Sequence, residues 1–385
     1  MATVKGTGAA DFIHRAGDGN VPLPGFNEVV GVTTGDDTID GRAGDDIIYG
    51  DGGNDTITGG LGTDTLYGGD GDDRFVVSSI AEINGLAEFM DGGAGTNQLR
   101  LDGLEGTVDI SNATLANMGT LILSPIGSGL TVSLSAEQLS AFSSFSGNPG
   151  RAGLALSSAG AVALSNGFFM NGVDSITGSS GNDTFDIEGS IISPLVIAGG
   201  AGNDSIALHS LSNDAKTTSY SLDGGEGDDE LKLTTGIGTL TGGKGKDELF
   251  GGKRADGLFG NAGKDELTGR GHQDMLTGGE SADSFIYQKL KDSLPEADRH
   301  DIITDFSHDQ GDRIDLHKID ADLTVAGDQA FFLAGSAFTG TPGELIQFAQ
   351  FGATIVQGDV DGNGVADIEI ALDNAPVLVA ADFIF

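Results

Sequence analysis

The chain lacks cysteine and tryptophan and is poor in basic residues. Without cysteine it can form neither a disulfide nor a thiolate metal site. Its 19 Lys and Arg residues stand against 58 Asp and Glu residues, which gives a formal net charge of -39. Such a charge repels nucleic acid, and it opposes compaction unless cations neutralise it. No apolar stretch is long enough to cross a membrane, so we expect no membrane span.

Bulky apolar side chains are also scarce, whereas glycine is abundant. The 65 glycines are costly to order, because glycine loses more backbone freedom on folding than any other residue. A chain with so little bulky core and so much negative charge needs another source of folding free energy. Bound metal ions can supply it, and such a chain is unfolded without metal and folded with it.

A phrase of nine residues recurs along the chain. Five copies run without a gap from Val32 to Val76, seven more run from Gly224 to Ile286, and isolated copies begin at Gly178 and Gly199. The copy GGLGTDTLY shows the pattern: glycine early in the phrase, aspartate in the sixth position and a large apolar residue in the eighth. Glycine permits turns with positive φ, which other residues resist. The eighth residue supplies one buried anchor per phrase.

The length of the phrase and its carboxylate together indicate a calcium-binding spiral. Nine residues suffice for a six-residue turn and a three-residue strand, so each phrase forms half a coil. If phrases alternate between two sides, the carboxylates of every second phrase stack about 4.8 Å apart and repel by roughly 1 kcal/mol per pair even in water. Carboxylate and carbonyl oxygens, without His or Cys, suit Ca²⁺. The expected metal ligands are Asp37, Asp46, Asp55, Asp64, Asp73, Asp183, Asp204, Asp229, Asp247, Asp256, Asp265, Asp274 and Asp283.

Several copies depart from the pattern. Gly238 leaves one phrase without its carboxylate, and Asn97 replaces the carboxylate of another, so we expect the turn at Asn97 to bind calcium weakly or not at all. Arg254, His272 and Ser281 replace the fourth-position glycine. Because these residues resist positive φ, we expect a distorted turn or a lower calcium affinity in these three copies.

The phrase GGxGxDxUx, in which U is a large apolar residue, resembles the repeat of the RTX (repeats-in-toxin) family. The resemblance implies a parallel β-roll with calcium inside its turns. Farther along, the stretch FIYQKLKDSLPEADRHDIITDFSHDQGDRIDL resembles the C-terminal domain that follows the roll in serralysin-type secreted proteases. Only that domain matches, because the chain contains neither a His-Glu-x-x-His zinc site nor a G-x-S-x-G elbow.

The same resemblance implies a route out of the cell. The N-terminal sequence has no apolar core of signal-peptide length. RTX proteins are exported unfolded by type I secretion machinery, directed by an uncleaved C-terminal signal. The residues Ala381 to Phe385 place an acidic residue before three apolar ones, similar to the signal of secreted metalloproteases of the family, although a last edge strand would have the same pattern. We expect an extracellular protein without a cleaved N-terminal signal peptide.

The chain between the two repeat blocks is nearly uncharged. Three segments there share a V-x-[IL]-S opening and begin at Val108, Val132 and Val162. Their spacings of 24 and 30 residues are typical of coils of a larger parallel β-helix, which needs no ions.

We therefore expect an all-β protein, a parallel β-roll or β-helix solenoid with two calcium-binding blocks and a C-terminal β cap. The N-terminal segment holds one degenerate phrase, GTGAADFIH, and two prolines, which suits a cap over the first coil. The expected sections are an N-terminal cap (1–31), a first calcium block (32–100), a charge-poor β-helix section (101–177), a second calcium block (178–286) and a serralysin-like C-terminal domain with the secretion signal (287–385).

The segment DVDGNG, which begins at Asp359, matches the opening of an EF-hand loop. The match then fails, because the last position of the loop lacks its glutamate. Asp359, Asp361, Asn363 and Asp367 could hold one Ca²⁺ in a loop between strands. An Asp-Asn-Gly hairpin turn explains them equally well.

The basic residues of the second block occupy variable positions that should face solvent. They could form a patch for an anionic glycan or lipopolysaccharide. The strongly acidic composition favours the other interpretation, in which they offset the carboxylates beside them. These residues are Lys244, Lys246, Lys253, Arg254, Lys264 and Arg270.

Two classes of function remain. In the preferred interpretation the chain is a non-enzymatic, extracellular calcium-binding protein that acts in adhesion, in a matrix or at a cell surface, because scaffold accounts for nearly every residue. Alternatively it is a carbohydrate-active β-helix enzyme, or an accessory module, that acts on acidic polysaccharide. Arg100, Asp102, Glu105 and Asp109 could then line a groove, but they also fit ordinary solvated turns. Four tyrosines and no tryptophan offer few aromatic platforms for a sugar.

Overall fold

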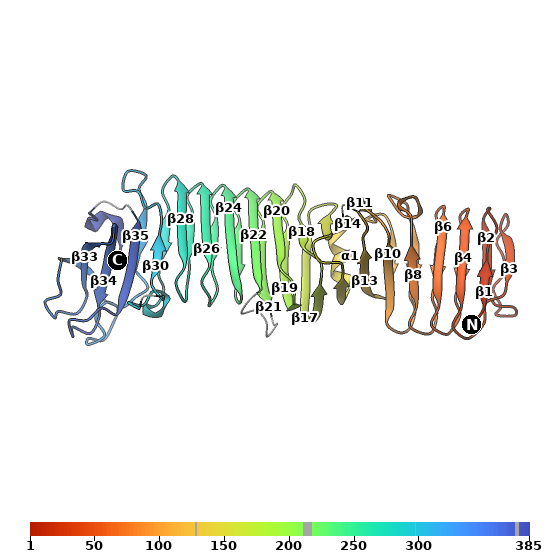
Figure 1. Ribbon diagram of the computed structural model, residues 1–385, viewed down its shortest axis with the longest axis horizontal. Helices are drawn as coiled ribbons and strands as arrows, with labels where there is room; N and C mark the ends of the chain where they lie inside the picture. Colours follow the sequence, from red (N-terminus) through yellow and green to blue (C-terminus); the bar gives the residue numbers. More distant parts are fainter. Residues whose placement is uncertain (128, 211–217, 297, 374–376) are drawn as a thin grey trace. The chain divides into compact units, whose positions relative to one another are not determined.

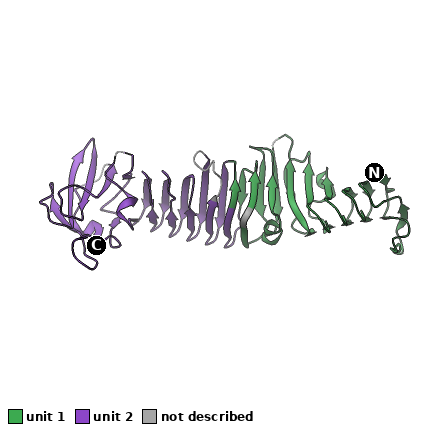
Figure 2. Ribbon diagram, turned by 90° about the horizontal axis from the view of Figure 1, so that it is seen from below, with its two compact units in different colours: residues 1–177, 189–193 green, residues 178–188, 194–385 purple. Residues whose placement is uncertain are grey.

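A computed structural model shows a protein built almost entirely of β-strands. It describes residues 1–127, 129–210, 218–296, 298–373 and 377–385. None of the helices in these ranges is long and apolar enough to cross a membrane. The chain divides into two compact units: unit 1 comprises residues 1–177 and 189–193, and unit 2 comprises residues 178–188 and 194–385 (Figure 2).

In unit 1 the nonapeptide phrases form two rows of short parallel strands. One row pairs Ile39 with Ile57 and Ile57 with Phe75, and the other pairs Ile48 with Leu66. These eighth-position side chains are at most 2% exposed, so they form the core of the spiral. The strands are β4 (Thr38–Ala43), β6 (Thr56–Leu61) and β8 (Arg74–Val77) in the first row, and β5 (Ile47–Tyr49), β7 (Thr65–Tyr67) and β9 (Phe89–Asp91) in the second.

Each phrase is half a coil, as expected, but β4 and β6 are longer than three residues. Both strands continue through the first three residues of the next phrase, where Arg42 pairs with Gly60 and Ala43 pairs with Leu61. Arg42 and Gly60 adopt positive φ angles of 78° and 108°. The backbone therefore turns while it stays paired with the neighbouring coil.

The N-terminal segment, expected to be a cap, pairs with the first coil of the roll. β1 (Thr3–Lys5) pairs with β4, and β2 (Asp11–His14) pairs with β5 and with β3 (Asn27–Val30). The phrase GTGAADFIH places Ile13 opposite Ile48, so its apolar residue occupies the same place as in a regular phrase. Most of this segment is thus a further coil of the spiral.

The charge-poor section of unit 1 forms larger coils of the same kind (Figure 1). The coils lengthen after the 3₁₀ turn η1 (Ile80–Glu82), and the section contains a short helix, α1 (Ala136–Ala141), and β12 (Thr114–Ala116), which pairs with β9. One row holds β10 (Asn97–Asp102), β13 (Met118–Ser124), β15 (Ser144–Ser146) and β17 (Ala161–Asn171), and the other holds β11 (Gly106–Asp109), β14 (Leu130–Leu134), β16 (Ala152–Leu156) and β18 (Ser175–Thr177).

The register of these strands confirms part of the longer repeat. Val108 pairs with Val132, which is the expected spacing of 24 residues. The expected third copy is wrong, because Val132 pairs with Leu154, whereas Val162 lies on β17 in the other row. The segment LALS at Leu154 has the same opening with leucine in place of valine, and its alternation buries Leu154 and Leu156.

Unit 2 has the same two-row arrangement, and eighth-position residues again stack in two buried columns, Leu222–Leu240–Leu258–Leu276 and Leu231–Leu249–Leu267–Phe285. The first row holds β20 (Leu195–Ala201), β22 (Ser219–Glu226), β24 (Ile237–Lys244), β26 (Gly257–Ala262) and β28 (Met275–Glu280). The second row holds β21 (Ser205–Ser210), β23 (Glu230–Leu233), β25 (Glu248–Phe250), β27 (Glu266–Thr268) and β29 (Ser284–Ile286). The residues of β19 (Thr184–Ile191) are divided between the two units.

Beyond the repeats, unit 2 changes from parallel to antiparallel pairing. β30 (Asp301–Ile303) and β31 (Arg313–Asp315) still pair in parallel with β28 and β29, whereas β33 (Glu344–Gln350), β34 (Ala353–Asp359) and β35 (Ile368–Asp373) are antiparallel. The remaining elements are η2 (Leu290–Asp292), β32 (Phe332–Gly335), η3 (Ala380–Asp382) and β36 (Phe383–Ile384), an edge strand that pairs with β31. The expected all-β solenoid is confirmed in both units.

Candidate metal centres in the turns

The sixth-position aspartates form ladders along the turns. The Oδ1 atom of Asp55 accepts the backbone N–H of Asp37 at 2.7 Å, and the Oδ1 atom of Asp73 accepts that of Asp55 at 2.8 Å. The same bond joins the N–H of Asp46 to Asp64 Oδ1 at 2.8 Å in the other row. The carboxylates of every second phrase therefore stack, as the period predicts.

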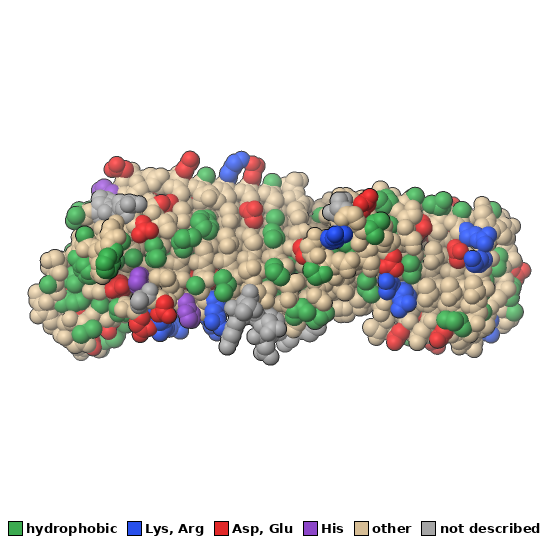
Figure 3. Space-filling model, viewed as in Figure 1, with side chains coloured by type: hydrophobic (Ala, Val, Ile, Leu, Met, Phe, Trp, Pro, Cys, Tyr) green, Lys and Arg blue, Asp and Glu red, His purple; other side chains and the backbone are tan. Residues whose placement is uncertain are grey.

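All the expected metal ligands are buried, with at most 4% of their surface exposed. On the face shown in Figure 3, backbone and uncharged, non-hydrophobic side chains (tan) cover most of the surface, with Asp and Glu side chains scattered over it. In unit 2 one ladder joins Asp256 to Asp274, and the other runs through Asp183, Asp204, Asp229, Asp247, Asp265 and Asp283. Burying so many carboxylates is strongly unfavourable unless positive charge accompanies them.

The second oxygen of most of these carboxylates is buried and has no hydrogen-bond partner among the described residues. A buried polar atom without a partner is rare in folded proteins, because its lost hydration is not replaced. A regular series of such atoms indicates that a cation belongs beside them. The carboxylates concerned are Asp46, Asp55, Asp73, Asp204, Asp229, Asp247, Asp265, Asp274 and Asp283.

These oxygens face backbone carbonyls of the next coil. A Cβ atom placed on Gly50 would lie 2.5 Å from Asp55 Oδ2 and 2.3 Å from the carbonyl oxygen of Gly68. Gly224 and Gly260 of the second block have the same surroundings. Oxygens that accept but cannot donate thus converge beside the glycine. Such hard donors, from carboxylate and carbonyl groups, fit Ca²⁺.

The pKa values of these carboxyl groups also reflect buried negative charge that no positive charge of the protein compensates. Burial raises the pKa of Asp46 and of Asp55 to about 7, and the negative charge of neighbouring ladder carboxylates adds to the rise. Burial likewise raises the pKa of Asp265 to about 7 and that of Asp274 to about 8. A divalent cation beside these oxygens would favour their ionised form and reverse the shift.

Three of the expected ligands differ, because their own turns satisfy the second oxygen. Asp37 Oδ2 accepts the backbone N–H of Thr33, and Asp183 Oδ2 accepts that of Ser179, each at 2.6 Å. The turn at Asp256 closes in the same way, with a 2.6 Å bond from the N–H of Gly252. These turns leave no unpaired oxygen and have less need of a cation.

The residues that depart from the nonapeptide pattern affect their turns in different ways. His272 and Ser281 keep the positive φ of the glycine they replace, at 73° and 89°, so their turns retain the regular path. Arg254 does not adopt positive φ. Its turn is the one in which the N–H of Gly252 donates to Asp256. At Asn97 the amide nitrogen donates to the Asn117 carbonyl oxygen at 3.1 Å, so a hydrogen bond serves where a cation would otherwise be needed.

Four further acidic residues extend the ladders and are absent from the expected set. Asp46 Oδ1 accepts the N–H of Asp11, and the N–H groups of Asp64, Asp274 and Asp283 bond to Glu88 Oε2, Asp301 Oδ1 and Asp312 Oδ1. Glu88 and Asp301 each keep one buried oxygen without a partner in the described chain. Counting back from the phrase at 92 places Glu88 in the sixth position, a signal that was available in the sequence.

The fifth position carries a second ladder that the sequence interpretation missed. Asp36 Oδ1 accepts the backbone N–H of Asn54 at 2.9 Å, and Asn54 Oδ1 accepts that of Asp72 at 2.8 Å. These bonds are exposed and run opposite to those of the sixth-position ladder. The recurrence of Asp or Asn in the fifth position was the available signal, and the bonds help to hold neighbouring turns in register.

The loop between β34 and β35 brings three carboxylates together. Oxygen atoms of Asp359, Asp361 and Asp367 lie within 4.8 Å of one another. The carboxylate of Asp359 also accepts backbone N–H groups of Gly362 and Gly364, each at 2.8 Å. A calcium loop and a hydrogen-bonded hairpin turn both account for this arrangement.

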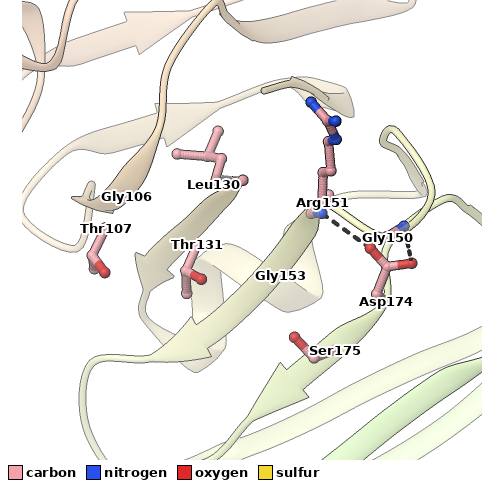
Figure 4. Close-up of a pocket in the computed structure, with 11 residues that line it drawn as sticks. Gly106, Thr107, Leu130, Thr131, Gly150, Arg151, Gly153, Asp174 and Ser175 are labelled. Atoms are coloured by element: carbon pink, nitrogen blue, oxygen red, sulfur yellow. Dashed lines mark hydrogen bonds between the residues drawn. The ribbon is translucent and has the colours of Figure 1, made fainter. Parts of the chain in front are cut away.

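The residues suggested for polysaccharide chemistry do not form a lined groove. Asp102 on β10 forms an ion pair with Arg100, whereas Asp109 lies on β11 in the other row. The hollow in this section has a volume of about 380 Å³ and is lined mainly by small residues (Figure 4). Its one carboxylate, Asp174, accepts the N–H groups of Gly150 and Ala152 at 2.7 and 3.0 Å, so it is not free to act on a substrate.

A family model described as the peptidase M10 serralysin C terminal matches residues 131–385. The chain belongs to this family. A second model, the RTX calcium-binding nonapeptide repeat, matches residues 27–57 and 50–78, so this is a calcium-binding RTX-type protein. No His-Glu-x-x-His motif occurs in the sequence. Both kinds of domain are typical of secreted proteins.

Two further comparisons add little. A solved structure of the AlgE6R3 subunit from the Azotobacter vinelandii mannuronan C5-epimerase is 30% identical and covers 39% of this chain and 78% of that one, with a TM-score of 0.28. No curated protein matches the chain.

Proposed function

We propose that the protein is exported unfolded and folds on calcium outside the cell. Its roll then serves as a non-enzymatic scaffold in adhesion, in a matrix or at a cell surface. The observation that carries this proposal is the series of buried carboxylate oxygens without partners in the described turns. They make the metal-free roll costly to form, and calcium is scarce inside cells and abundant outside them.

The bound ions should be held mainly where the second carboxylate oxygen is unpaired, as in Asp46, Asp55 and Asp73 of the first block. Turns in which a backbone N–H already donates to the second carboxylate oxygen, as at Asp37, should bind calcium more weakly. The direct test is a calcium titration of metal-free protein followed by circular dichroism and by particle size. We expect β structure and compaction to appear together, and full β structure in excess chelator would contradict the proposal.

The proposed export signal is the segment from Ala381 to Phe385. In the folded protein its Phe383 and Ile384 form the edge strand β36, which pairs with β31. An edge strand and an export signal are compatible, because the secretion machinery would meet the chain before it folds. Deletion of these five residues should abolish export by a type I system, whereas unchanged export would count against the signal.

The enzyme interpretation is the second candidate, and the geometry favours it less. Asp102 is engaged by Arg100, and the hollow of the charge-poor section offers no free carboxylate among the described residues. Assays on polyuronates with and without calcium separate the two. Turnover that disappears in Asp102→Asn, with folding intact, would establish the enzyme instead.

A further inference from the structure

One row of turns in unit 2 surrounds a hollow. The turns that begin at residues 233, 251, 269 and 287 follow one another at intervals of 18 residues, which is one full coil. Their second and third positions all line a hollow of about 750 Å³. These lining residues are Thr234 and Thr235, Gly252 and Lys253, Arg270 and Gly271, and Gln288 and Lys289.

The hollow is strongly basic although the protein is strongly acidic. Five of the 19 Lys and Arg residues of the chain line it: Lys253, Arg270, Lys289, Lys291 and Arg299. Its carboxylate, Asp292, is 5% exposed and accepts the backbone N–H groups of Gln288 and Lys289 at 3.0 and 2.9 Å. The charged side chains that reach solvent in this hollow are therefore positive.

Internal ion pairs account for only one of these cations, because Arg299 pairs with the exposed Glu296 at 3.2 Å. Among the described residues, Lys253, Lys289 and Lys291 form no ion pair, and Arg270 lies over the ring of Phe250, 5.5 Å from its centre. The opposite row of turns differs. There Lys244 pairs with Glu226, and Lys246 pairs with Glu266 at 2.7 Å. Lys244 and Lys246 are thus neutralised within the protein, whereas Lys253, Lys289 and Lys291 are not.

The same row of turns has less need of calcium than the opposite row, where Asp229, Asp247, Asp265 and Asp283 all have an unpartnered buried oxygen. Its sixth positions hold Gly238, Asp256, Asp274 and Asp292 in succession. Gly238 has no carboxylate, and backbone N–H groups satisfy the second oxygen of Asp256 and that of Asp292. In this series only Asp274 has a buried oxygen without a partner, and Asp301, which accepts the N–H of Asp274, has another. A row of turns that binds few cations has room for lysine and arginine.

We propose that this hollow binds an acidic oligosaccharide through its carboxylate or sulfate groups. The volume lies in the usual range for ligand sites. Several separate cations suit a ligand whose charges are spaced along a chain. The amide of Gln288 and the ring of His272 line the same hollow and can bond to sugar hydroxyl groups. The inference rests on the proposed extracellular role, to which it adds a class of ligand.

Nucleic acid suits the hollow less well. Proteins that bind single strands stack the bases on aromatic rings, and His272 is the one ring-bearing residue that lines this hollow in the described chain. The net charge of -39 also repels a long polyanion, whereas a short oligosaccharide can contact the hollow alone.

The test is isothermal titration of calcium-loaded protein with a short oligogalacturonate and with a short sulfated oligosaccharide. The double substitution Lys289→Gln and Lys291→Gln should weaken binding about tenfold or more, because it removes two charged donors. The control is Lys244→Gln with Lys246→Gln, which makes the same change in net charge at paired lysines. It should keep the affinity within about twofold.

Several outcomes would overturn the inference. These are no binding by the unsubstituted protein, equal weakening in the two variants, and tighter binding of a single-stranded DNA oligomer. Unchanged binding in Lys289→Gln/Lys291→Gln would also overturn it, because the sugar would then be held elsewhere. Circular dichroism of each variant in calcium checks its fold. A protein that folds on calcium but ignores both sugars rejects this inference and leaves the proposed folding role standing.

Discussion

The nonapeptide section and the charge-poor section of unit 1 build the same parallel coils by different means. In the first, Asp46, Asp55 and Asp73 each bury an oxygen without a partner in the described chain. In the second, buried polar groups satisfy one another: the amide of Gln138 donates to the carbonyl oxygens of Ile110 and Ala113 at 2.9 and 2.7 Å. The coil itself therefore does not require calcium, but buried carboxylates do.

The difference also shows in the way neighbouring coils are joined at their turns. Nonapeptide turns are linked by bonds from backbone N–H groups to carboxylate oxygens, as between Asp37 and Asp55. On the strands, apolar residues stack in register and are buried in both sections, as Ile39 and Ile57 are in the first and Val108, Val132 and Leu154 in the second. Apolar burial there provides stability without ions.

Removal of calcium should have the largest effect and should separate the two sections. We expect the coils between Val32 and Val76 to lose hydrogen-exchange protection in excess chelator, because their carboxylates then repel without compensation. The coils between residues 101 and 177 should keep much of theirs. Hydrogen exchange read by mass spectrometry measures both at once, and equal loss in the two sections would break the comparison.

Substitution of single carboxylates should have the next largest effect. Asp55→Ala should lower calcium stoichiometry and cost about 3 to 5 kcal/mol of stability in calcium, because Asp55 stacks between Asp37 and Asp73 and would hold an ion with its unpaired oxygen. Asp183→Ala should cost about 1 kcal/mol, since Ser179 already satisfies its second oxygen. Calorimetric titration and thermal unfolding measure the two quantities. Equal losses in the two variants would contradict the stacking scheme.

Acidification should stabilise the metal-free nonapeptide coils. Burial raises the pKa of Asp46 and Asp55 to about 7, and that of Glu88 to about 8. The folded state therefore binds protons more tightly than the unfolded state. The stability gained is fully present below the unfolded pKa of about 4 and is lost as the pH rises through about 7 to 8.

Circular dichroism in chelator should accordingly show β structure increasing from about pH 8 to about pH 4. In calcium the trend should reverse, because protons compete with the metal for the same oxygens. The charge-poor section contains few titrating groups and should respond little. A metal-free protein that loses β structure on mild acidification would show that the buried carboxyl groups do not control the pH dependence of its stability.

The smallest expected effect concerns the charge-poor section alone. Gln138→Ala removes two buried hydrogen bonds and one partner of the capping box with Ser135. It should cost about 1 to 3 kcal/mol, because the carbonyl groups of Ile110 and Ala113 lose their donor. The loss should be the same at low and high calcium. Thermal unfolding at two calcium concentrations checks this, and a loss that excess calcium repairs would mean that the two sections are not independent.

The regular part of this protein could be predicted from its sequence. A strict nine-residue period places residues 18 apart on neighbouring coils, so the stacking of Asp37, Asp55 and Asp73 and the burial of the eighth residues follow from counting. The period fails where the spacing changes. Asp274 bonds to Asp301, 27 residues later, and Asp283 bonds to Asp312, 29 residues later, and no repeat marks these partners.

By itself, the sequence determined the coil, the position of the carboxylates and the need for cations, because a fixed period along a chain imposes fixed neighbours in a spiral. The tertiary structure alone decided which carboxylate oxygens lack a partner, since that depends on whether the N–H of a turn points at its own aspartate, as in Gly252 and Asp256. It also decided that Leu154, and not Val162, stacks on Val132. Where the phrases become irregular, the register is set by which side chains can be buried together.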